Sequence, residues 1–240
     1  MSFDAPHLIS YGKDKGWWRS GHAFAYQCKH QLFKGCPLEG RRFLDIGCGD
    51  GRWALWAKSQ GASYVVGLEP SAGGSTTGAP LRFSQAIETL GLEDTHLMQY
   101  GFEDYEVETP FDVILLNDVV NHFNQDLCEL LPENIKARDF YLQTFGRLRS
   151  MISAGGHLVV TDCTSKNFWG DEKSPFMPSV RFSIHQPPEV WSDLLVESGF
   201  KNVQLSWEGW PRIFHLAKLL DNSLVAYFTH SHFKLLMEAA

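Results

Sequence analysis

Residues 43–51 read FLDIGCGDG, a short apolar run followed by three glycines that are separated by single residues. The run from Arg42 to Ile46 is typical of a buried strand, and a helical pattern begins at Arg52. Glycines at such a strand-to-helix turn can adopt positive φ and let the backbone approach a ligand closely. In an open α/β sheet, ligands bind at the carboxyl ends of the strands. Residues 47–51 are therefore the first candidate for a binding site.

The spacing and the charges of this turn indicate which ligand it suits. The three glycines are spaced G-x-G-x-G, whereas the dinucleotide fingerprint G-x-G-x-x-G/A requires glycine or alanine at position 52, where the chain has Arg52. Asp45 and Asp50 would repel a pyrophosphate at the start of the helix and attract a positively charged ligand. The turn therefore favours a cationic nucleoside over a dinucleotide.

Further acidic and aromatic residues follow the next two expected strands. Glu69 closes the second strand, where a carboxylate can accept hydrogen bonds from both hydroxyls of a ribose. Phe102 and Glu103 follow the third strand, where an apolar ring and a carboxylate can contact a purine and its amino group. These positions extend the candidate site along the same edge of the sheet.

The rest of the chain alternates β-branched runs with helical patterns, which predicts an α/β fold with a mostly parallel sheet. After residue 116, apolar residues recur at helical spacing up to Leu131, and Gly155-Gly156 is expected to end a later helix. The expected strands are residues 42–46, 63–68, 96–100, 111–116, 157–161, 200–207 and 231–237. The expected helices are residues 52–60, 81–90, 137–152 and one that starts at Pro187.

Composition bears on partners and location. The 240 residues include 21 Lys and Arg against 28 Asp and Glu, a formal net charge of −7, which disfavours phosphate backbones and anionic membranes. The five scattered cysteines predict neither a disulfide framework nor a structural zinc site. No segment resembles a signal peptide or reaches the ~20 apolar residues of a membrane helix. We therefore expect a cytoplasmic protein without a nucleic-acid or membrane partner.

Four segments, taken in order, resemble the motifs of class I S-adenosylmethionine-dependent methyltransferases: residues 43–51, 65–70, 111–117 and 155–160. The resemblance extends over about residues 40–208. It implies a seven-stranded, mostly parallel, Rossmann-like sheet with helices on both faces and an antiparallel last strand. It also implies S-adenosyl-L-methionine as the cofactor.

The resemblance also implies roles for individual residues. Asp45 would lie near the methionine amino group, and Asn117 would line the methionine moiety. The loop 71–80 is longer and richer in glycine than in many members of the family. The remaining cofactor-binding candidates are Gly47, Cys48, Gly49 and Gly51 in the turn, Glu69 and Pro70 beside the ribose, and Phe102 and Glu103 beside the adenine.

With no linker or repeat in the chain, we expect a single methyltransferase domain over residues 1–240. Its expected parts are an N-terminal cap (1–40), a cofactor-binding core (41–162), a substrate loop (163–186) and a C-terminal helix and β-hairpin (187–240).

A general base is needed only if the acceptor atom carries a proton of high pKa. His122 follows Asp118 by four residues, so on a helix both side chains would share one face. A carboxylate beside an imidazole raises its basicity and fixes its tautomer. Asp118 and His122 are the catalytic candidates, although a histidine near a helix start is also common as a surface or capping residue.

Candidates for acceptor binding lie outside the core. Trp17 and Trp18 can cover the cofactor or simply pack against the sheet, and Arg181 can hold a carboxylate or phosphate or remain solvated. Metal-dependent methyl transfer is disfavoured because Cys163 stands where an asparagine would follow Asp162. No metal is expected.

The predicted activity is S-adenosylmethionine-dependent transfer of a methyl group to an oxygen or nitrogen of a small-molecule acceptor by direct displacement. Two alternatives stay open: a protein or RNA methyltransferase, and a cofactor-binding interaction protein without catalysis. The sequence does not choose between O- and N-methylation, and it indicates no oligomeric state.

Overall fold

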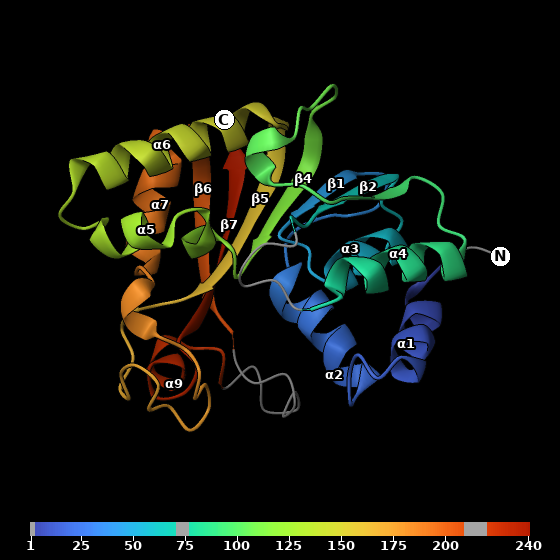
Figure 1. Cartoon of the computed structure of the whole chain (residues 1–240), viewed down its shortest axis with the longest axis horizontal. Coiled ribbons are helices and arrows are strands. Elements are labelled where there is room, and N and C mark those ends of the chain that lie inside the picture. The colour runs from blue at the N-terminus through green and yellow to red at the C-terminus, as the bar shows by residue number, and fades with distance from the viewer. Residues whose placement is uncertain (1–2, 71–76, 209–219) are drawn as a thin grey trace. The chain divides into compact units, whose positions relative to one another are not determined.

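The computed structural model describes residues 3–70, 77–208 and 220–240 (Figure 1). The chain forms two compact units, residues 1–117 and residues 118–240. The strands are β1 (Arg42–Ile46), β2 (Tyr64–Leu68), β3 (Thr95–Met98), β4 (Phe111–Asn117), β5 (Ile152–Cys163), β6 (Phe200–Trp207) and β7 (His232–Ala239). They form a seven-stranded sheet in the order β3-β2-β1-β4-β5-β7-β6, which confirms the predicted fold class.

The described helices fall between these strands. The α-helices are α1 (Ala5–Asp14), α2 (Gly21–Tyr26), α3 (Arg52–Ser59), α4 (Ala79–Leu90), α5 (Gln125–Leu130), α6 (Ile135–Ser150), α7 (Pro188–Glu197) and α9 (Ser223–Phe228). Short helical segments are the π-helix η1 (Gln27–Leu32) and the 3-10 helices η2 (Phe102–Asp104), η3 (Val120–Phe123) and η4 (Phe182–Ile184). None of the helices in these described stretches combines the length and apolar character needed to cross a bilayer.

The first unit is built around four parallel strands. Ile46 of β1 pairs with Leu68 of β2 and with Leu116 of β4, so the three strands end at the same level. Their apolar side chains are almost wholly buried, as expected for parallel strands covered on both faces. This register places the segments that follow β1, β2 and β4 at one edge of the sheet.

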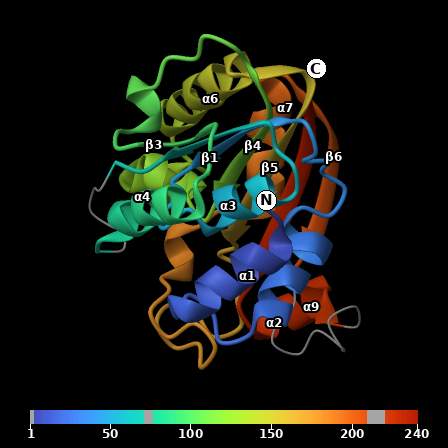
Figure 2. The ribbon, with the colours of Figure 1, turned by 90° about the vertical axis from the view of Figure 1, so that its right-hand side faces the viewer.

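The N-terminal segment packs within the first unit as a helical cap. Figure 2 shows α1 and α2 close to α3, and α1 contacts both of these helices. Trp18 stacks on Phe24 with ring centroids 4.0 Å apart, and Phe24 stacks in turn on Trp53 of α3 at 5.5 Å. Aromatic stacking therefore joins the N-terminal segment to the helix that follows the glycine turn.

The second unit contains β5, β7 and β6. Strand β7 is antiparallel to both neighbours, as predicted for the last strand. Helix α6 packs against α7 through Tyr141 and Trp191, whose ring centroids are 5.1 Å apart. Both rings are fully buried, so α6 and α7 contribute aromatic side chains to the core of this unit.

Two predicted boundaries in the second unit are wrong. The apolar repeat between Val120 and Leu131 is interrupted at Asn124, whose side chain accepts a hydrogen bond from the Leu127 amide and starts α5. Gly155 and Gly156 do not end a helix; they lie inside β5, which begins at Ile152 directly after the cap of α6. Part of the expected loop 71–80, residues 71–76, lies outside the described residues.

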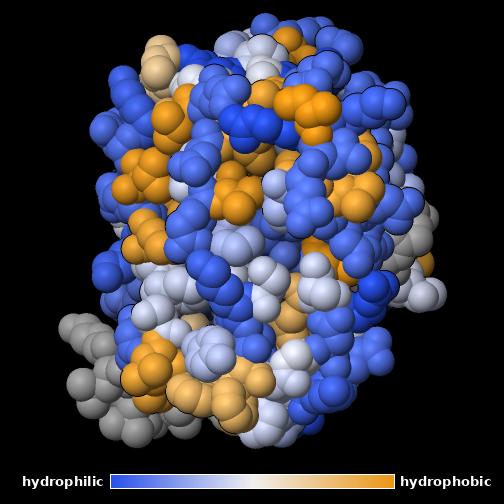
Figure 3. Space-filling model, turned by 90° about the vertical axis from the view of Figure 1, so that its left-hand side faces the viewer, coloured by the Kyte–Doolittle hydropathy of each residue, from blue (hydrophilic) through white to orange (hydrophobic). Residues whose placement is uncertain are grey.

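Large apolar side chains also occur on the surface. Figure 3 shows apolar groups interspersed with hydrophilic ones on the face it presents. Single exposed apolar residues are normal in folded proteins and call for no partner. The larger ones in the second unit are Leu130, Ile135, Phe168, Val196, Val203, Leu205, Leu224, Tyr227 and Phe228.

Candidate functional site

The glycine turn after β1 has the backbone that its sequence predicts. Gly47, Gly49 and Gly51 have φ of 72°, 53° and 74°, in the left-handed region that favours glycine. At Gly51 a Cβ atom would lie 2.1 Å from the buried ring of Phe83, so a larger residue does not fit. The turn therefore depends on glycine both for its conformation and for space.

Glu69 ties the end of β2 to this turn. Its buried carboxylate accepts a hydrogen bond from the Gly49 amide, with Oε2 2.7 Å from the nitrogen. The Gly47 and Cys48 amides donate to the Leu68 carbonyl, each at 2.9 Å. The predicted ribose-binding carboxylate thus lies directly beside the predicted cofactor loop.

Asp45 is fully buried at the end region of β1. Both carboxylate oxygens lack a hydrogen-bond partner of normal geometry among the described residues. Burial raises the pKa of Asp45 to about 8, and the nearby carboxylates of Glu69 and Asp50 act in the same direction. The Ala54 backbone acts against this shift. A buried carboxylate with a raised pKa beside a glycine turn fits a ligand that brings a cationic amino group.

Asp50 departs from the expectation that it would face a cationic ligand. Its two oxygens bind the Arg52 guanidinium, at 2.8 Å from Nε and 2.5 Å from Nη2. Arg52 is the residue that breaks the dinucleotide fingerprint, and its charge offsets that of Asp50. The carboxylates that can attract a cationic ligand are therefore those of Asp45 and Glu69.

The other cofactor candidates lie in the same unit. Cys48 and Phe102 are buried, Asn117 is half-buried at the end of β4, and Glu103 and Pro70 are exposed. Because Ile46 pairs with Leu116, the residues after them, Gly47 and Asn117, lie at the same edge of the sheet. Their contacts with a cofactor stay predictions.

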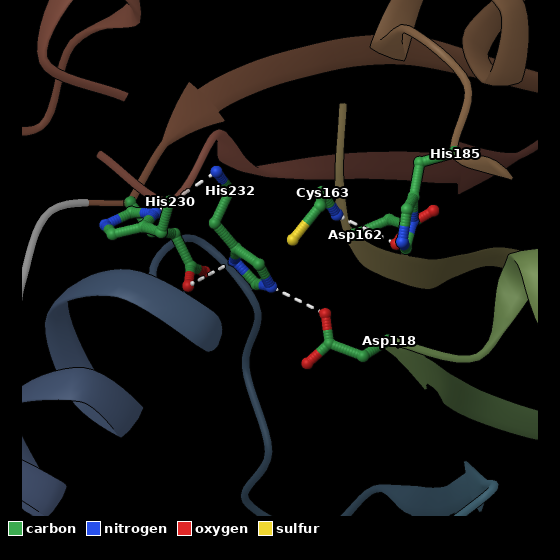
Figure 4. Close-up of polar contacts among 7 residues, drawn as sticks. Asp118, Asp162, Cys163, His185, His230 and His232 are labelled. Atoms are coloured by element: carbon green, nitrogen blue, oxygen red, sulfur yellow. Dashed lines mark hydrogen bonds and ion pairs between the residues drawn. The ribbon is translucent and has the colours of Figure 1, made fainter. Parts of the chain in front are cut away.

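A second cluster of charged residues lies in the second unit (Figure 4). Its centre is His232, the first residue of β7. His232 Nε2 lies 2.6 Å from Asp118 Oδ1, and Nδ1 lies 3.1 Å from Glu208 Oε2. Asp118 directly follows β4 and has a φ of 55°, a conformation that is uncommon for residues other than glycine.

The two carboxylates determine the charge of this histidine. Burial by itself would lower the pKa of His232, but Asp118 and Glu208 raise it well above its usual value, so the imidazolium form prevails at neutral pH. The neighbouring His230 behaves oppositely: burial, together with the charge of His232, lowers its pKa to about 4. Its Nδ1 accepts a hydrogen bond from the His232 amide at 3.2 Å.

A further pair joins the end of β5 to the segment after η4. Asp162 Oδ1 lies 2.8 Å from His185 Nδ1 and also accepts a hydrogen bond from the Cys163 amide at 2.8 Å. Burial raises the pKa of Asp162, and His185 acts against that shift. The pair anchors the expected substrate loop, residues 163–186, to the sheet of this unit.

The expected pairing of Asp118 with His122 is wrong. Asp118 precedes the 3-10 helix η3 instead of lying on an α-helix, so a spacing of four residues does not put the two side chains on one helical face. His122 is exposed, and the Asp118 carboxylate bonds to His232 instead. The motif His230-x-His232 was visible in the sequence, but nothing local indicates that its second histidine meets a residue 114 positions earlier.

The predicted acceptor-binding residues lie in different surroundings. Trp17 and Trp18 are half-buried in the N-terminal aromatic stack, which supports the packing interpretation. Arg181 is exposed at the start of η4, and its charge helps to lower the pKa of Asp171, after the hydrogen bonds from Ser183. Within residues 3–70, 77–208 and 220–240, His, Cys, Asp and Glu side chains form no group of three or more suited to a metal ion.

Comparison with known proteins identifies the family. The family model described as a methyltransferase domain matches residues 22–240, across both units. The chain belongs to this methyltransferase family. Membership of this family confirms the resemblance that the sequence motifs indicate, and S-adenosylmethionine is the cofactor that the resemblance implies.

Curated relatives of this methyltransferase are named "tRNA U34 carboxymethyltransferase". The relative from Pseudoalteromonas translucida is 31% identical over 177 residues, which cover 70% of this chain and 47% of the relative. The relative from Methylococcus capsulatus is 26% identical over 204 residues, which cover 77% and 56%. The chain thus spans about half the length of these relatives. Their name runs against the expectation that no nucleic acid is involved.

Solved structures support the fold. An S-adenosylmethionine-dependent methyltransferase from Mesorhizobium loti aligns with a TM-score of 0.56 at 18% identity, over 84% of this chain and 92% of that one. A protein from Listeria monocytogenes assigned to the same activity aligns with a TM-score of 0.58 at 14% identity, over 90% and 99%. At these identities the likeness shows the shared fold alone.

The residues present fit the cofactor of the family. S-adenosylmethionine supplies a methyl group on a positively charged sulfur and carries an amino group, a ribose and an adenine. The buried carboxylate of Asp45 suits the amino group, and Glu69 at the end of β2 suits the ribose hydroxyls. Sequence patterns did not identify Glu208 and His232 as members of the cluster around Asp118.

Proposed function

We propose that this methyltransferase modifies an oxygen or nitrogen of a base in RNA. The observation that carries the proposal is the agreement among curated relatives, which match 61–77% of the chain and carry one name, that of a tRNA-modifying enzyme. A base edge that carries an ionisable N–H or O–H is a suitable acceptor, because its proton must leave as the methyl group arrives.

The geometry of the second unit supports an acceptor of this kind. Direct displacement needs alignment of the reacting atoms above all, and a base only where the acceptor carries a proton. Asp118 offers a carboxylate whose side chain is 51% exposed, bonded to His232 on one side. An acceptor atom without a proton would not need such a base.

The proposal is tested by methyl transfer from labelled S-adenosylmethionine to unmodified tRNA. We expect label in the tRNA, at a rate that falls as salt is raised, because phosphate contacts are lost to counterions. The matched control is the same tRNA digested to nucleosides. If intact tRNA and its digest were labelled equally, the enzyme would not recognise the RNA chain. If neither were labelled, a base of RNA would not be the acceptor.

A second candidate, a small-molecule acceptor, is favoured by the charge of the chain. With 28 acidic against 21 basic residues, the protein repels a phosphate backbone unless basic side chains gather locally. Adding a mixture of small metabolites to the same assay separates the two candidates. Label confined to the small-molecule fraction would favour this second candidate and reject RNA.

A further inference from the structure

We propose that Asp118 receives the proton of the acceptor, and that His232 and Glu208 are positioning residues that hold its carboxylate. The inference rests on the proposed function in one respect, namely that the acceptor atom carries a proton. It does not depend on whether that atom belongs to RNA or to a small molecule.

The three side chains are joined in series, with His232 between Glu208 and Asp118; Figure 4 shows the ring of His232 directed at Asp118. The side chain of Glu208 is 8% exposed, that of His232 is 16% exposed and that of Asp118 is 51% exposed. Glu208 directly follows β6, and its amide donates to the His232 carbonyl at 3.1 Å. The exposed end is therefore the end that an acceptor and water can reach.

The two contacts of the ring exclude His232 itself as the base. Each ring nitrogen faces a carboxylate oxygen, so both nitrogens serve as N–H donors and no lone pair is available. Asp118 and Glu208 hold the pKa of His232 high, which keeps the ring cationic. The roles expected from the sequence are thus exchanged: the carboxylate is the proton acceptor, and the imidazolium orients it.

Asp118 is held in place from two sides. Its amide donates to the Thr161 carbonyl at 3.0 Å, and its carboxylate bonds to His232. A residue with positive φ stays in that conformation only where its surroundings fix it, and such residues cluster at functional sites. These two bonds give the carboxylate a defined direction beside the end of β4.

The chemical step balances without further reactants. A bond forms between the acceptor oxygen or nitrogen and the methyl carbon, while the bond from that carbon to sulfur breaks and its electron pair stays on sulfur. The proton of the acceptor passes to Asp118 and then to water, and His232 keeps both of its protons. A carboxylate is a sufficient base, because the acceptor atom becomes strongly acidic as its new bond forms.

Other titratable groups surround the cluster. His230, which is neutral at physiological pH, is buried two residues before the start of β7, and Cys163 and Asp162 come from the end of β5. Burial raises the pKa of the Cys163 thiol to about 12, so it stays protonated. Near neutral pH, the charges of His232 and Asp162 act on Asp118 with opposite signs.

The kinetic test compares three variants with a matched control. Asp118→Asn is expected to lower kcat by about 100-fold or more with little change in cofactor affinity. His232→Gln is expected to lower kcat about tenfold and to move the acid limb of the pH–rate profile to higher pH, because Asp118 loses a stabilising cation. Glu208→Gln keeps the imidazole beside Asp118 and is expected to lower kcat less than His232→Gln. The control is His157→Gln in the middle of β5, in the same unit.

A purely structural role for His232 would lower the rate without moving the acid limb. Full activity of Asp118→Asn would overturn the proposal. So would loss of activity in His122→Gln with an unchanged rate in His232→Gln, since the base would then be the histidine first expected from the sequence.

An independent measurement needs no acceptor. In protein with nitrogen-15 histidines, His232 should show two protonated ring nitrogens at about pH 7.5, and Asp118→Asn should lower its pKa. A neutral His232 at that pH would overturn the proposal. If no acceptor is labelled but His232 titrates as expected, the proposed function has failed and the charge arrangement stands.

Discussion

Asp45 and Asp118 show how differently two carboxylates of one chain can be placed. Asp45 is fully buried and lacks a partner of normal geometry among the described residues, whereas Asp118 is half-exposed and bonded to an imidazolium. An unpaired buried carboxylate is costly in its ionised form, and Asp45 avoids that cost by remaining protonated at neutral pH. A cationic amino group would restore the ionised form.

The buried state of Asp45 predicts a pH dependence of stability. The pKa of Asp45 rises from its ordinary value of 3.8 to about 8 in the folded protein, so between these values the folded state binds more protons than the unfolded state. The free energy of unfolding should therefore fall with rising pH in that window, by up to about 1.4 kcal/mol per pH unit. Denaturant unfolding without cofactor at several pH values measures the slope.

Asp45→Asn is the matched comparison for this slope. Because the amide does not titrate, the difference in unfolding free energy between variant and parent should change steadily between about pH 5 and pH 7. A difference that stays constant over that range would show that Asp45 is ionised in the folded protein.

Glu69 allows a direct test of cofactor binding. Glu69→Ala removes the carboxylate that holds the Gly49 amide and that we expect to bind the ribose, so the affinity for S-adenosylmethionine should fall about tenfold or more. Calorimetric titration measures the change. The control is Glu88→Ala on the exposed surface of α4, and equal affinities of the two variants would remove Glu69 from the site.

Residues that act through local geometry could be predicted from the sequence. The glycine turn, Asp45 and Glu69 were found because strand ends and glycine spacing are features of short segments. The contact of Asp118 with His232 could not be found, because it joins residues 114 positions apart through the pairing of strands. The salt bridge of Asp50 with Arg52 lies within three residues but depends on side-chain rotamers, which the pattern does not indicate.

At the scale of helices and strands, the ends of an element could be predicted best where its side chains are buried along its whole length. Strands β1 and β4 were predicted to within one residue, because a strand buried on both faces leaves an unambiguous apolar run. Strand β6 was also predicted to within one residue, although most of its residues are exposed. Strand β5 was predicted too short, because Gly155 and Gly156 resemble a helix stop. The helix after β4 was predicted as continuous, because apolar spacing says nothing of the cap at Asn124.

The glycine turn predicts a difference between two substitutions at positive φ. Gly51→Ala combines an unfavourable backbone with a clash against Phe83 and should cost about 3 kcal/mol of unfolding free energy. Gly91→Ala, at the end of α4, meets nothing within 4 Å and should cost about 1 kcal/mol. Thermal or denaturant unfolding compares them, and equal costs would mean that Phe83 does not constrain the turn.

At the scale of the whole molecule, the proposed roles are divided between two units. The residues that suit the cofactor lie in residues 1–117, the Asp118 cluster lies in residues 118–240, and one family model spans both. Methyltransferases of this fold differ in their acceptors, so the fold does not identify the substrate. The acidic charge of the chain and the name of its relatives point in different directions, which makes the acceptor assay decisive.

The cofactor site depends on a buried Asp45 that receives the cationic amino group of the cofactor. Calorimetric titration of S-adenosylmethionine in two buffers of different ionisation enthalpy, at about pH 7, measures the protons exchanged on binding. We predict release of about one proton per cofactor bound, because Asp45 ionises, and none from Asp45→Asn. Binding to the parent protein without proton release, or no binding at all, would contradict the account.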